Sequence, residues 1–388
     1  MCEVSAESLL EGHTVQSRIA ARCARAFLIA ARRARAFLQR NLHPGDWTSR
    51  LPGATGRPSG NRFPSRCPAL GAVGEEPADH TPVSGRLAGM VTRSVWLVPL
   101  GLATAAVGYA AGIERRTPVL RRVTVPVLPE GERPLRVLHI SDAHLTPRQG
   151  WKRRWLRKLD DLQPDVIVNT GDSIAHPEAV PAFVDAIQPL LARPGVFVLG
   201  SNDRYAPRFK NPLRYLLPDD GRRVHGPMLP WRELVDSLER HGWRHLGNAR
   251  AVLEIGGRRV EFRGVDDPHI WCDRYDDIAG PVDRNVLIGI GVTHSPEPRV
   301  VSRMAADGCR LVLAGHTHGG QLRVPFYGAL VTNCGLDRRR ARGLSRYDAT
   351  WLHVSAGLGT SPLAPVRFSC PPEATLITLV GRDHAPVG

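Results

Sequence analysis

The stretch "LRVLHISDAH", residues 135–144, decides how the rest of the chain is interpreted. A short apolar run typical of a β-strand ends at Ser141, and Asp142 and His144 follow it two residues apart. Side chains two apart in an extended chain point the same way, so this spacing predicts that the pair faces one direction. A single D-x-H after a strand is commonly structural. Its interpretation therefore depends on whether other strands end in the same way.

Four further apolar runs also end in side chains that can bind a metal. These endings are "NTGD" (169–172), "LGSND" (199–203), "GVTH" (291–294) and "LAGHTH" (313–318). Segments with a helical pattern separate the runs, near residues 151–162, 177–191, 231–241 and 298–307. Strands that alternate with helices predict a layered α/β domain, and such sheets place their ligands beyond the carboxyl ends of the strands. We therefore expect five separate segments to converge on one rim.

The side chains at these strand ends are of the types that bind hard or borderline metal ions. Imidazole, carboxylate and amide oxygen suit Mn, Fe or Zn. The seven cysteines are scattered and never form C-x-x-C, so they predict neither a disulfide framework nor a thiolate site. Asp172, on the second of the five segments, is expected to bridge two ions.

The order of these motifs resembles that of the calcineurin-like metallophosphoesterase superfamily, D-x-H, G-D, G-N-H-[DE], H and G-H-x-H. The tracts "GHTHGGQLRVPFYGAL" (315–330) and "VSAGLGTSPLAPVRFSCPPEATLITL" (354–379) look like its membrane-associated bacterial phosphodiesterase branch, the YkuE/YaeI type. The resemblance covers residues 135–379. It implies a four-layer α/β fold, a central β-sandwich of mixed sheets flanked by helices.

The resemblance also implies two divalent metal ions. Asp142, His144, Asp172 and His318 would hold the first ion. Asp172, Asn202, His294 and His316 would hold the second ion.

The third motif departs from the family pattern, because "GSND" stands where the family has G-N-H-[DE]. Without a gap, Ser201 occupies the ligand position. A shift of one residue instead makes Asn202 the ligand and puts Asp203 at the position of the family's histidine, which helps protonate the leaving group. We favour the shift, because an amide oxygen is a better ligand than a neutral hydroxyl and a one-residue bulge costs little. Asp203 and Asp172 are then the candidate catalytic residues, with His176 and His269 as alternative proton donors.

Two divalent ions and two carboxylates leave the predicted site positively charged, so it favours an anion such as a phosphate ester. A water shared by two ions becomes a nucleophile, and the ions clamp an in-line displacement. We predict a metal-dependent phosphohydrolase that cleaves phosphoester, phosphodiester or pyrophosphate bonds, with a phosphorylated small molecule or a lipid precursor of the UDP-diacylglucosamine type as substrate. The alternatives are a nucleotide or nucleic-acid phosphodiesterase and a non-catalytic, metal-stabilised binding protein.

The region before the domain has a different composition. Residues 1–89 are rich in Pro, Gly, Ser and Arg, which predicts disorder, and Met90 offers an alternative translation start. Residues 94–113 are uncharged, mostly apolar and long enough to span a bilayer. They predict a single N-terminal anchor in the cell membrane, with a cleaved secretory signal or a buried helix as alternatives. Basic residues lie on both sides, so the orientation stays open. The metallophosphoesterase domain is expected over residues 121–388.

The chain is strongly basic, with a formal net charge of +15. This charge suits an anionic substrate or an anionic membrane surface. No nucleic-acid-binding motif accompanies it, so we expect neither a nucleic-acid partner nor, from any other feature, a protein partner. The basic and aromatic stretch 204–228 is a candidate substrate flap, and "GVDDPH" (264–269) is expected to pack as a loop at the rim of the site.

Overall fold

The computed structural model of the protein describes residues 101–208, 225–324, 327–329 and 331–384. The predicted disordered segment 1–89 lies outside these residues, as does most of the candidate flap. The predicted hydrophobic helix lies partly outside them. Residues 101–108 are α-helical and run into a π-helical turn, η1 (Tyr109–Ile113). Within the described ranges, no helix is long and apolar enough to cross a membrane.

Two six-stranded sheets form the centre of the domain. The first sheet has the strand order β1 (Val119–Leu128), β14 (Glu373–Gly381), β2 (Leu135–Ile140), β3 (Val166–Asn169), β4 (Gly195–Phe197), β5 (Arg244–His245). The second has the order β12 (Gly343–Tyr347), β13 (Thr350–Val354), β9 (Leu311–Ala314), β8 (Ile288–Val292), β7 (Arg258–Gly264), β6 (Ala249–Ile255). A separate two-stranded hairpin consists of β10 (Arg323–Val324) and β11 (Gly328–Ala329).

Both sheets are mixed, with parallel strands at their centres. Strands β2, β3, β4 and β5 pair in parallel in the first sheet, and β7, β8, β9 and β13 do so in the second. The inner faces pack on each other through valines, isoleucines and leucines, among them Val137, Val168 and Ile290. Because the central strands are also covered on their outer faces, they are continuous apolar runs, as the sequence indicated.

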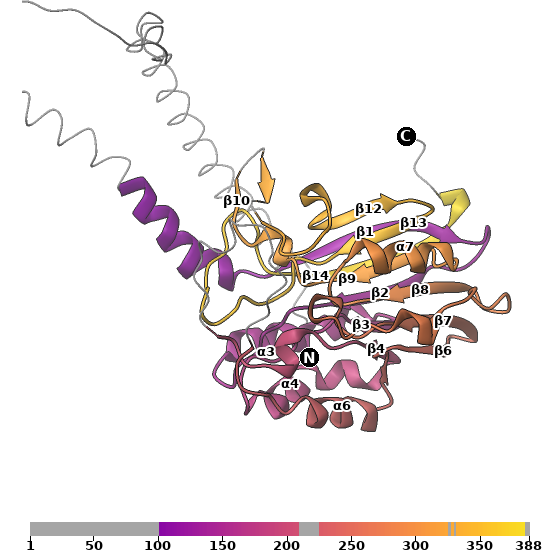
Figure 1. The fold of residues 1–388 in the computed structure, drawn as a ribbon, viewed down its shortest axis with the longest axis horizontal. Helices are drawn as coiled ribbons and strands as arrows, with labels where there is room; N and C mark the ends of the chain where they lie inside the picture. The colour runs from indigo at the N-terminus through magenta and orange to yellow at the C-terminus, as the bar shows by residue number, and fades with distance from the viewer. Residues whose placement is uncertain (1–100, 209–224, 325–326, 330, 385–388) are drawn as a thin grey trace, which may run out of the picture. The chain divides into compact units, whose positions relative to one another are not determined.

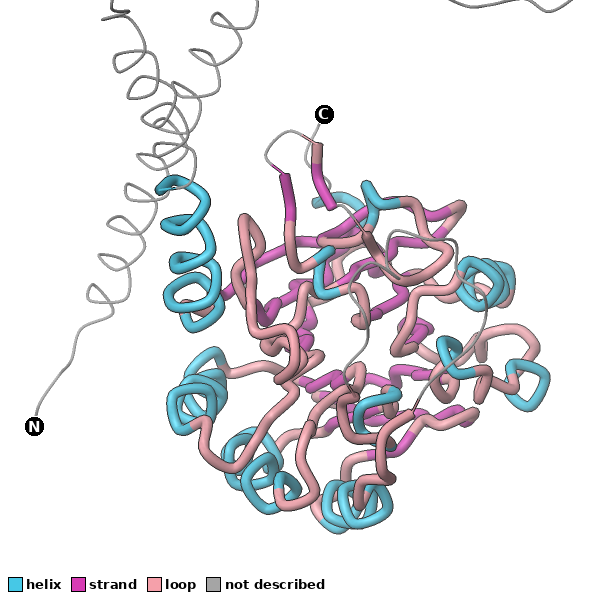
Figure 2. Tube along the Cα trace, turned by 60° about the vertical axis from the view of Figure 1, so that its left-hand side comes forward, coloured by secondary structure: helices cyan, strands magenta, loops and turns pink. Residues whose placement is uncertain are grey.

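Helices cover the outer faces of the sandwich, and Figure 1 shows three of them, α3, α4 and α6, together on one side of the strands. These are α3 (Gly150–Arg157), α4 (Ala179–Ile187) and α6 (Trp231–Arg240), which share an apolar core with the first sheet. On the other side α7 (Pro298–Ala306) packs Val300, Val301 and Met304 against the second sheet. Figure 2 shows the helices around the outside with the strands between them. The predicted four-layer fold is confirmed.

The four segments with a helical sequence pattern form helices. The predicted segments 151–162 and 177–191 become α3 and α4, each continued by a 3₁₀ turn, and 231–241 and 298–307 become α6 and α7. In α6 the buried Leu234, Val235 and Leu238 recur at helical spacing and face the core. This scaffold brings the carboxyl ends of the parallel strands of both sheets to the loops that contain the predicted ligands.

Candidate metal centre

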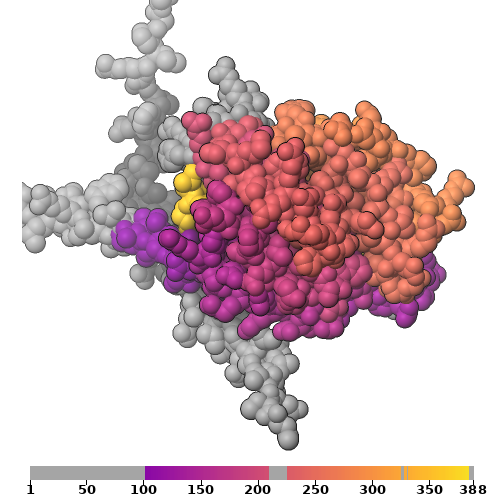
Figure 3. All heavy atoms as spheres, turned by 90° about the horizontal axis from the view of Figure 1, so that it is seen from below, coloured from indigo at the N-terminus to yellow at the C-terminus, as the bar shows by residue number. Residues whose placement is uncertain are grey.

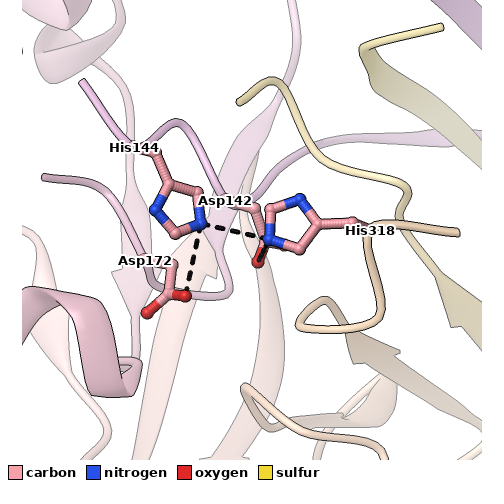
Figure 4. Close-up of side chains that lie close together, drawn as sticks. All are labelled: Asp142, His144, Asp172 and His318. Atoms are coloured by element: carbon pink, nitrogen blue, oxygen red, sulfur yellow. Dashed lines mark hydrogen bonds and ion pairs between the residues drawn. The ribbon is translucent and has the colours of Figure 1, made fainter. Parts of the chain in front are cut away.

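Four of the predicted ligands form a compact buried cluster (Figure 4). One ligand atom from each of Asp142, His144, Asp172 and His318 lies within 4.8 Å of the others. His144 Nε2 lies 3.1 Å from His318 Nε2 and 3.4 Å from Asp172 Oδ2. His318 Nε2 also lies 3.6 Å from Asp142 Oδ1. Two imidazole nitrogens and two carboxylates converging in this way fit a divalent cation.

A second group of histidines adjoins the same aspartate. His294 Nε2 lies 3.5 Å from Asp172 Oδ2 and 3.3 Å from His316 Nδ1. The other ring nitrogens contact backbone carbonyls, His294 Nδ1 at 2.7 Å from Thr170 and His316 Nε2 at 3.1 Å from Asn333. These contacts leave His294 Nε2 and His316 Nδ1 facing the centre. Asp172 thus lies between the two groups, where a bridging carboxylate was predicted.

Asn202 also contacts Asp172, but as a hydrogen-bond donor. Its backbone N–H donates to Asp172 Oδ1 at 2.8 Å and its side-chain amide donates to Oδ2 at 2.7 Å. β3 pairs with β4 in one continuous register that ends at Asn169 and Phe197, and the short helix α5 (Ser201–Arg204) begins directly after Gly200. The structure therefore brings Asn202 to the centre without a bulge in the described pairing.

Asp203 turns away from the centre and into the backbone. Its Oδ2 accepts N–H groups from Asp172 at 2.7 Å and Gly200 at 3.0 Å, and its Oδ1 accepts those of Ser173 at 2.7 Å and Ile174 at 3.2 Å. The side chain is fully buried. This geometry makes Asp203 a support for the loop that carries Asp172, and it does not favour the predicted role in proton donation.

The alternative proton donors lie in different places. His176 is exposed, and its Nδ1 accepts the N–H of Glu178 at 3.2 Å. His269 is buried, and its ring centroid lies 4.4 Å from that of His316. Of the two, only His269 packs directly on a predicted ligand.

The backbone at the ligands differs from the extended conformation that the two-residue spacings suggested. Five ligands have left-handed φ values: Asp142 (49°), His144 (41°), Asp172 (53°), His316 (68°) and His318 (49°). Such residues cost about 1–3 kcal/mol each and persist where surrounding contacts hold them. The directions of the predicted ligand side chains are therefore set by tight loops with left-handed residues. His318 consequently lies beside His144, whereas His316 lies beside His294, so the two histidines of "HTH" face different groups and not one direction, as two residues in an extended chain would.

Two glycines allow the loops to approach one another. A Cβ on Gly200 would collide with Asp172 Oδ1 and the ring of His294, and one on Gly315 would collide with Ser141 Oγ and Asp142 Oδ2. Neither residue has a left-handed φ. Close contact with the ligands, rather than conformational freedom, therefore requires glycine at both positions.

Burial and neighbouring charges prepare the ligands for a cation. Burial lowers the pKa of His144 to about 4, so its imidazole is neutral at pH 7. Burial raises the pKa of Asp142 to about 6, and the charge of Asp172 adds to that rise. Burial would also raise the pKa of Asp172, but His294 and His144 beside it hold the pKa well below its usual range. At neutral pH the centre therefore offers an ionised Asp172 and a neutral His144, whereas His294 beside Asp172 has a raised pKa and would release its proton when a cation binds.

Two buried charged residues near the centre were not predicted as site residues. Asp267, in the loop expected only to pack at the rim, accepts the N–H of His269 at 2.9 Å, while its Oδ2 has no hydrogen-bond partner among the described residues. Burial would lower the pKa of His294, but the charge of Asp172, and after it that of Asp267, raises this pKa well above its usual range. Arg367 is fully buried, and its Nη2 lies 3.4 Å from His318 Nδ1. The acidic pair in "GVDDPH" was a usable signal for Asp267, whereas a single arginine in a loop was not.

This fold and site define a class of protein. Residues 135–320 match the family Calcineurin-like phosphoesterase, so the chain carries a calcineurin-like metallophosphoesterase domain and is a hydrolase. The predicted resemblance is confirmed.

Three relatives show which members of that class the chain is similar to. It is 25% identical over 279 residues to the uncharacterized metallophosphoesterase YkuE of Bacillus subtilis, covering 70% of this chain and 89% of that protein. It is 28% identical to the phosphodiesterase YaeI of Escherichia coli, covering 57% of this chain and 72% of that one. It is 26% identical to the UDP-2,3-diacylglucosamine pyrophosphatase LpxG of Chlamydia trachomatis, covering 63% and 83%.

Proposed function

We propose that the protein is a metal-dependent phosphohydrolase with a dinuclear centre, acting on a phosphodiester or pyrophosphate. The observation that carries this proposal is the position of Asp172, whose Oδ2 lies 3.4 Å from His144 Nε2 and 3.5 Å from His294 Nε2. Two divalent cations, Mn, Fe or Zn, would supply a metal-activated water and offset the charge that develops on the phosphoryl oxygens.

The residues of the site have different roles in this proposal. Asp142, His144 and His318 would hold one ion, His294 and His316 would hold the other, and Asp172 would belong to both. Asn202 donates to both oxygens of Asp172 and so fixes the plane of the bridging carboxylate. The buried guanidinium of Arg367 beside His318 adds positive charge behind the centre and favours an anionic substrate.

A set of exposed apolar side chains supports a partly apolar substrate. Exposed apolar side chains lie on the N-terminal helix, on the segment that follows His318 and on the loop before β14. We call this set the apolar rim: Leu102, Val107, Ile113, Leu322, Val324, Tyr327 and Leu363. The rim segments are connected, because Tyr109 packs edge-on against Phe368 and Leu322 pairs with Phe368. In Figure 3 the start of the described chain protrudes beside a yellow patch from the C-terminal part.

The apolar rim and the similarity to the Chlamydia trachomatis pyrophosphatase support a phosphorylated lipid or lipid precursor as substrate. Exposed apolar groups beside basic side chains also suit an anionic membrane surface, as at Tyr327, whose hydroxyl accepts a hydrogen bond from Arg338. The N-terminal anchor in the cell membrane expected over residues 94–113 stays part of the proposal.

The test compares three substrates with the full chain and Mn²⁺: a lipid-linked pyrophosphate in mixed micelles, a water-soluble dinucleotide pyrophosphate, and a single-stranded oligonucleotide. We expect the highest kcat/KM on the lipid. Preference for the dinucleotide or the oligonucleotide would favour the nucleotide phosphodiesterase instead. Mn²⁺ binding without turnover of any substrate would favour the metal-stabilised binding protein.

A further inference from the structure

A chain of four hydrogen bonds runs through the interior and ends on the ligand Asp142. Ser141 Oγ donates to Asp142 Oδ2 at 2.5 Å, and Thr170 Oγ1 donates to Ser141 Oγ at 2.6 Å. His139 Nε2 lies 2.9 Å from Thr170 Oγ1, and His139 Nδ1 lies 3.0 Å from His353 Nδ1. All five residues are buried, none more than 1% exposed.

This row of hydrogen bonds crosses the β-sandwich from one sheet to the other. His139 belongs to β2 of the first sheet and His353 to β13 of the second, and their rings meet edge to face with centroids 5.1 Å apart. Both occupy the inner face, where apolar side chains otherwise fill the space between the sheets. A buried polar pair at this place is costly unless every hydrogen bond is made, so it needs a reason to be there.

The donors and acceptors that each group has available fix the direction of all four of these hydrogen bonds. An ionised Asp142 only accepts, so the Ser141 hydroxyl must donate to it, and the Thr170 hydroxyl then donates to Ser141. Thr170 Oγ1 has used its hydrogen, so His139 must donate from Nε2. A neutral His139 then accepts at Nδ1, and His353 must donate from its own Nδ1. Burial keeps both rings neutral, lowering the pKa of His353 to about 4 and that of His139 well below its usual range.

We propose that these hydrogen-bonded residues, His353–His139–Thr170–Ser141, form a positioning relay that holds Asp142 Oδ2 and so directs Oδ1 to the ligand cluster, where a metal ion would bind. The N–H of His316 lies 3.1 Å from Oδ2 and 3.2 Å from Oδ1, so it does not distinguish the two oxygens. This inference rests on the proposed metal centre. Asp142 Oδ1 is the oxygen 3.6 Å from His318 Nε2, on the side of the ligand cluster. Thr170 serves both halves of the centre, because its carbonyl is also 2.7 Å from His294 Nδ1. His139 and His353 are thus positioning residues that act on the metal without touching it.

The test measures metal binding without substrate. Partners behind metal ligands typically contribute 10–100-fold to metal affinity. In the full chain, His139→Phe breaks the relay with little change in volume, and we expect Mn²⁺ affinity at the tighter site to fall 10–100-fold by calorimetric titration. His139→Gln keeps an amide N–H near the place of Nε2 and should restore affinity to within about threefold of wild type. His245→Phe is the matched control, because His245 stacks on Phe197 in the same sheet outside the relay.

Unchanged Mn²⁺ affinity in a folded His139→Phe variant, or equal losses in His139→Phe and His245→Phe, would overturn the relay. A wild-type chain that binds no divalent cation would overturn the proposed function and the relay with it. If His139→Phe does not fold, nitrogen-15 NMR of the metal-free wild type decides. The relay requires a neutral His139 protonated at Nε2 and a neutral His353 protonated at Nδ1, and the opposite tautomers would contradict it.

Discussion

Asp203 shows how one side chain can hold a site together without facing the substrate. Its two oxygens accept four backbone N–H groups, and three of these belong to residues 172–174, the turn that carries the bridging aspartate. Because Asp172 has a left-handed φ of 53°, its conformation depends on such contacts. The carboxylate therefore offsets local strain where the two metal positions meet.

An Asp203→Asn substitution separates support from proton donation. The amide has one acceptor oxygen and directs its own N–H groups at backbone N–H groups, so we expect the free energy of unfolding to fall by about 2–4 kcal/mol. The remaining activity should keep the wild-type alkaline limb in its pH–rate profile. Urea denaturation and pH–rate measurements check the two outcomes. Loss of the alkaline limb with unchanged stability would instead identify Asp203 as the proton donor.

At the scale of elements, the loop between β13 and β14 is held by a single buried guanidinium. Arg367 donates to the carbonyls of Ala356 at 2.6 Å, Gly357 at 3.1 Å, Gly359 at 2.6 Å and Cys370 at 3.1 Å. All four of these acceptors are backbone carbonyls, although the charges of Glu373 and Asp142 also act on Arg367. The arginine thus organises a loop that packs against Asp142 and His318.

Arg367→Lys should therefore be a severe substitution. An ammonium group cannot reach all four carbonyls, and each carbonyl left unpaired in the interior costs about 1–3 kcal/mol. We expect a loss of at least about 3 kcal/mol in unfolding free energy, measured by urea denaturation. Arg122→Lys, at an exposed position of the edge strand β1, is the control and should change stability by less than about 0.5 kcal/mol. Equal stability of the two variants would show that Arg367 does not organise the loop.

Helix α3 supports the first ligand loop through Lys152. This lysine is 2% exposed, and its ammonium donates to the carbonyl of Ala143, which lies between Asp142 and His144. Burial lowers the pKa of Lys152 to about 7 from an ordinary value of 10.5. Between about pH 7 and pH 10.5, Lys152 is protonated in the unfolded chain and neutral in the folded chain. The free energy of unfolding therefore rises with pH in this range.

The free energy of unfolding should therefore carry a pH dependence that Lys152→Met removes. From pH 8 to 9 we expect the stability of the wild type relative to this variant to rise by about 1.4 kcal/mol. The measurement is urea denaturation of both proteins at both pH values. Because the unfolding free energy of the variant is subtracted from that of the wild type, the contributions of other titrating groups cancel. If this difference in unfolding free energy stays constant or shrinks as the pH rises, the pKa of Lys152 is not lowered by burial and the prediction is wrong.

At the scale of the whole molecule, strand ends were predictable because they follow from local sequence. Apolar runs that stop at Asp142, Asp172, His294 and His316 indicated both the sheets and the rim. The rest depends on contacts between residues far apart in the chain. The left-handed turn at His318, the four hydrogen bonds of Asp203 and the contact between His139 and His353 require the packed sandwich. A histidine in an apolar run such as "VLHIS" carries no local sign of its partner 214 residues away.

Turnover by an Asp172→Asn variant tests the central claim, a dinuclear metal phosphohydrolase, most directly. The measurement is the kcat of the full chain on bis-p-nitrophenyl phosphate with saturating Mn²⁺, with Asp276→Asn, an exposed aspartate outside the centre, as the matched control. Because both groups of histidines depend on this carboxylate, we predict that Asp172→Asn lowers kcat by at least about 10³-fold while the control stays within twofold of wild type. Wild-type turnover by Asp172→Asn would contradict the account.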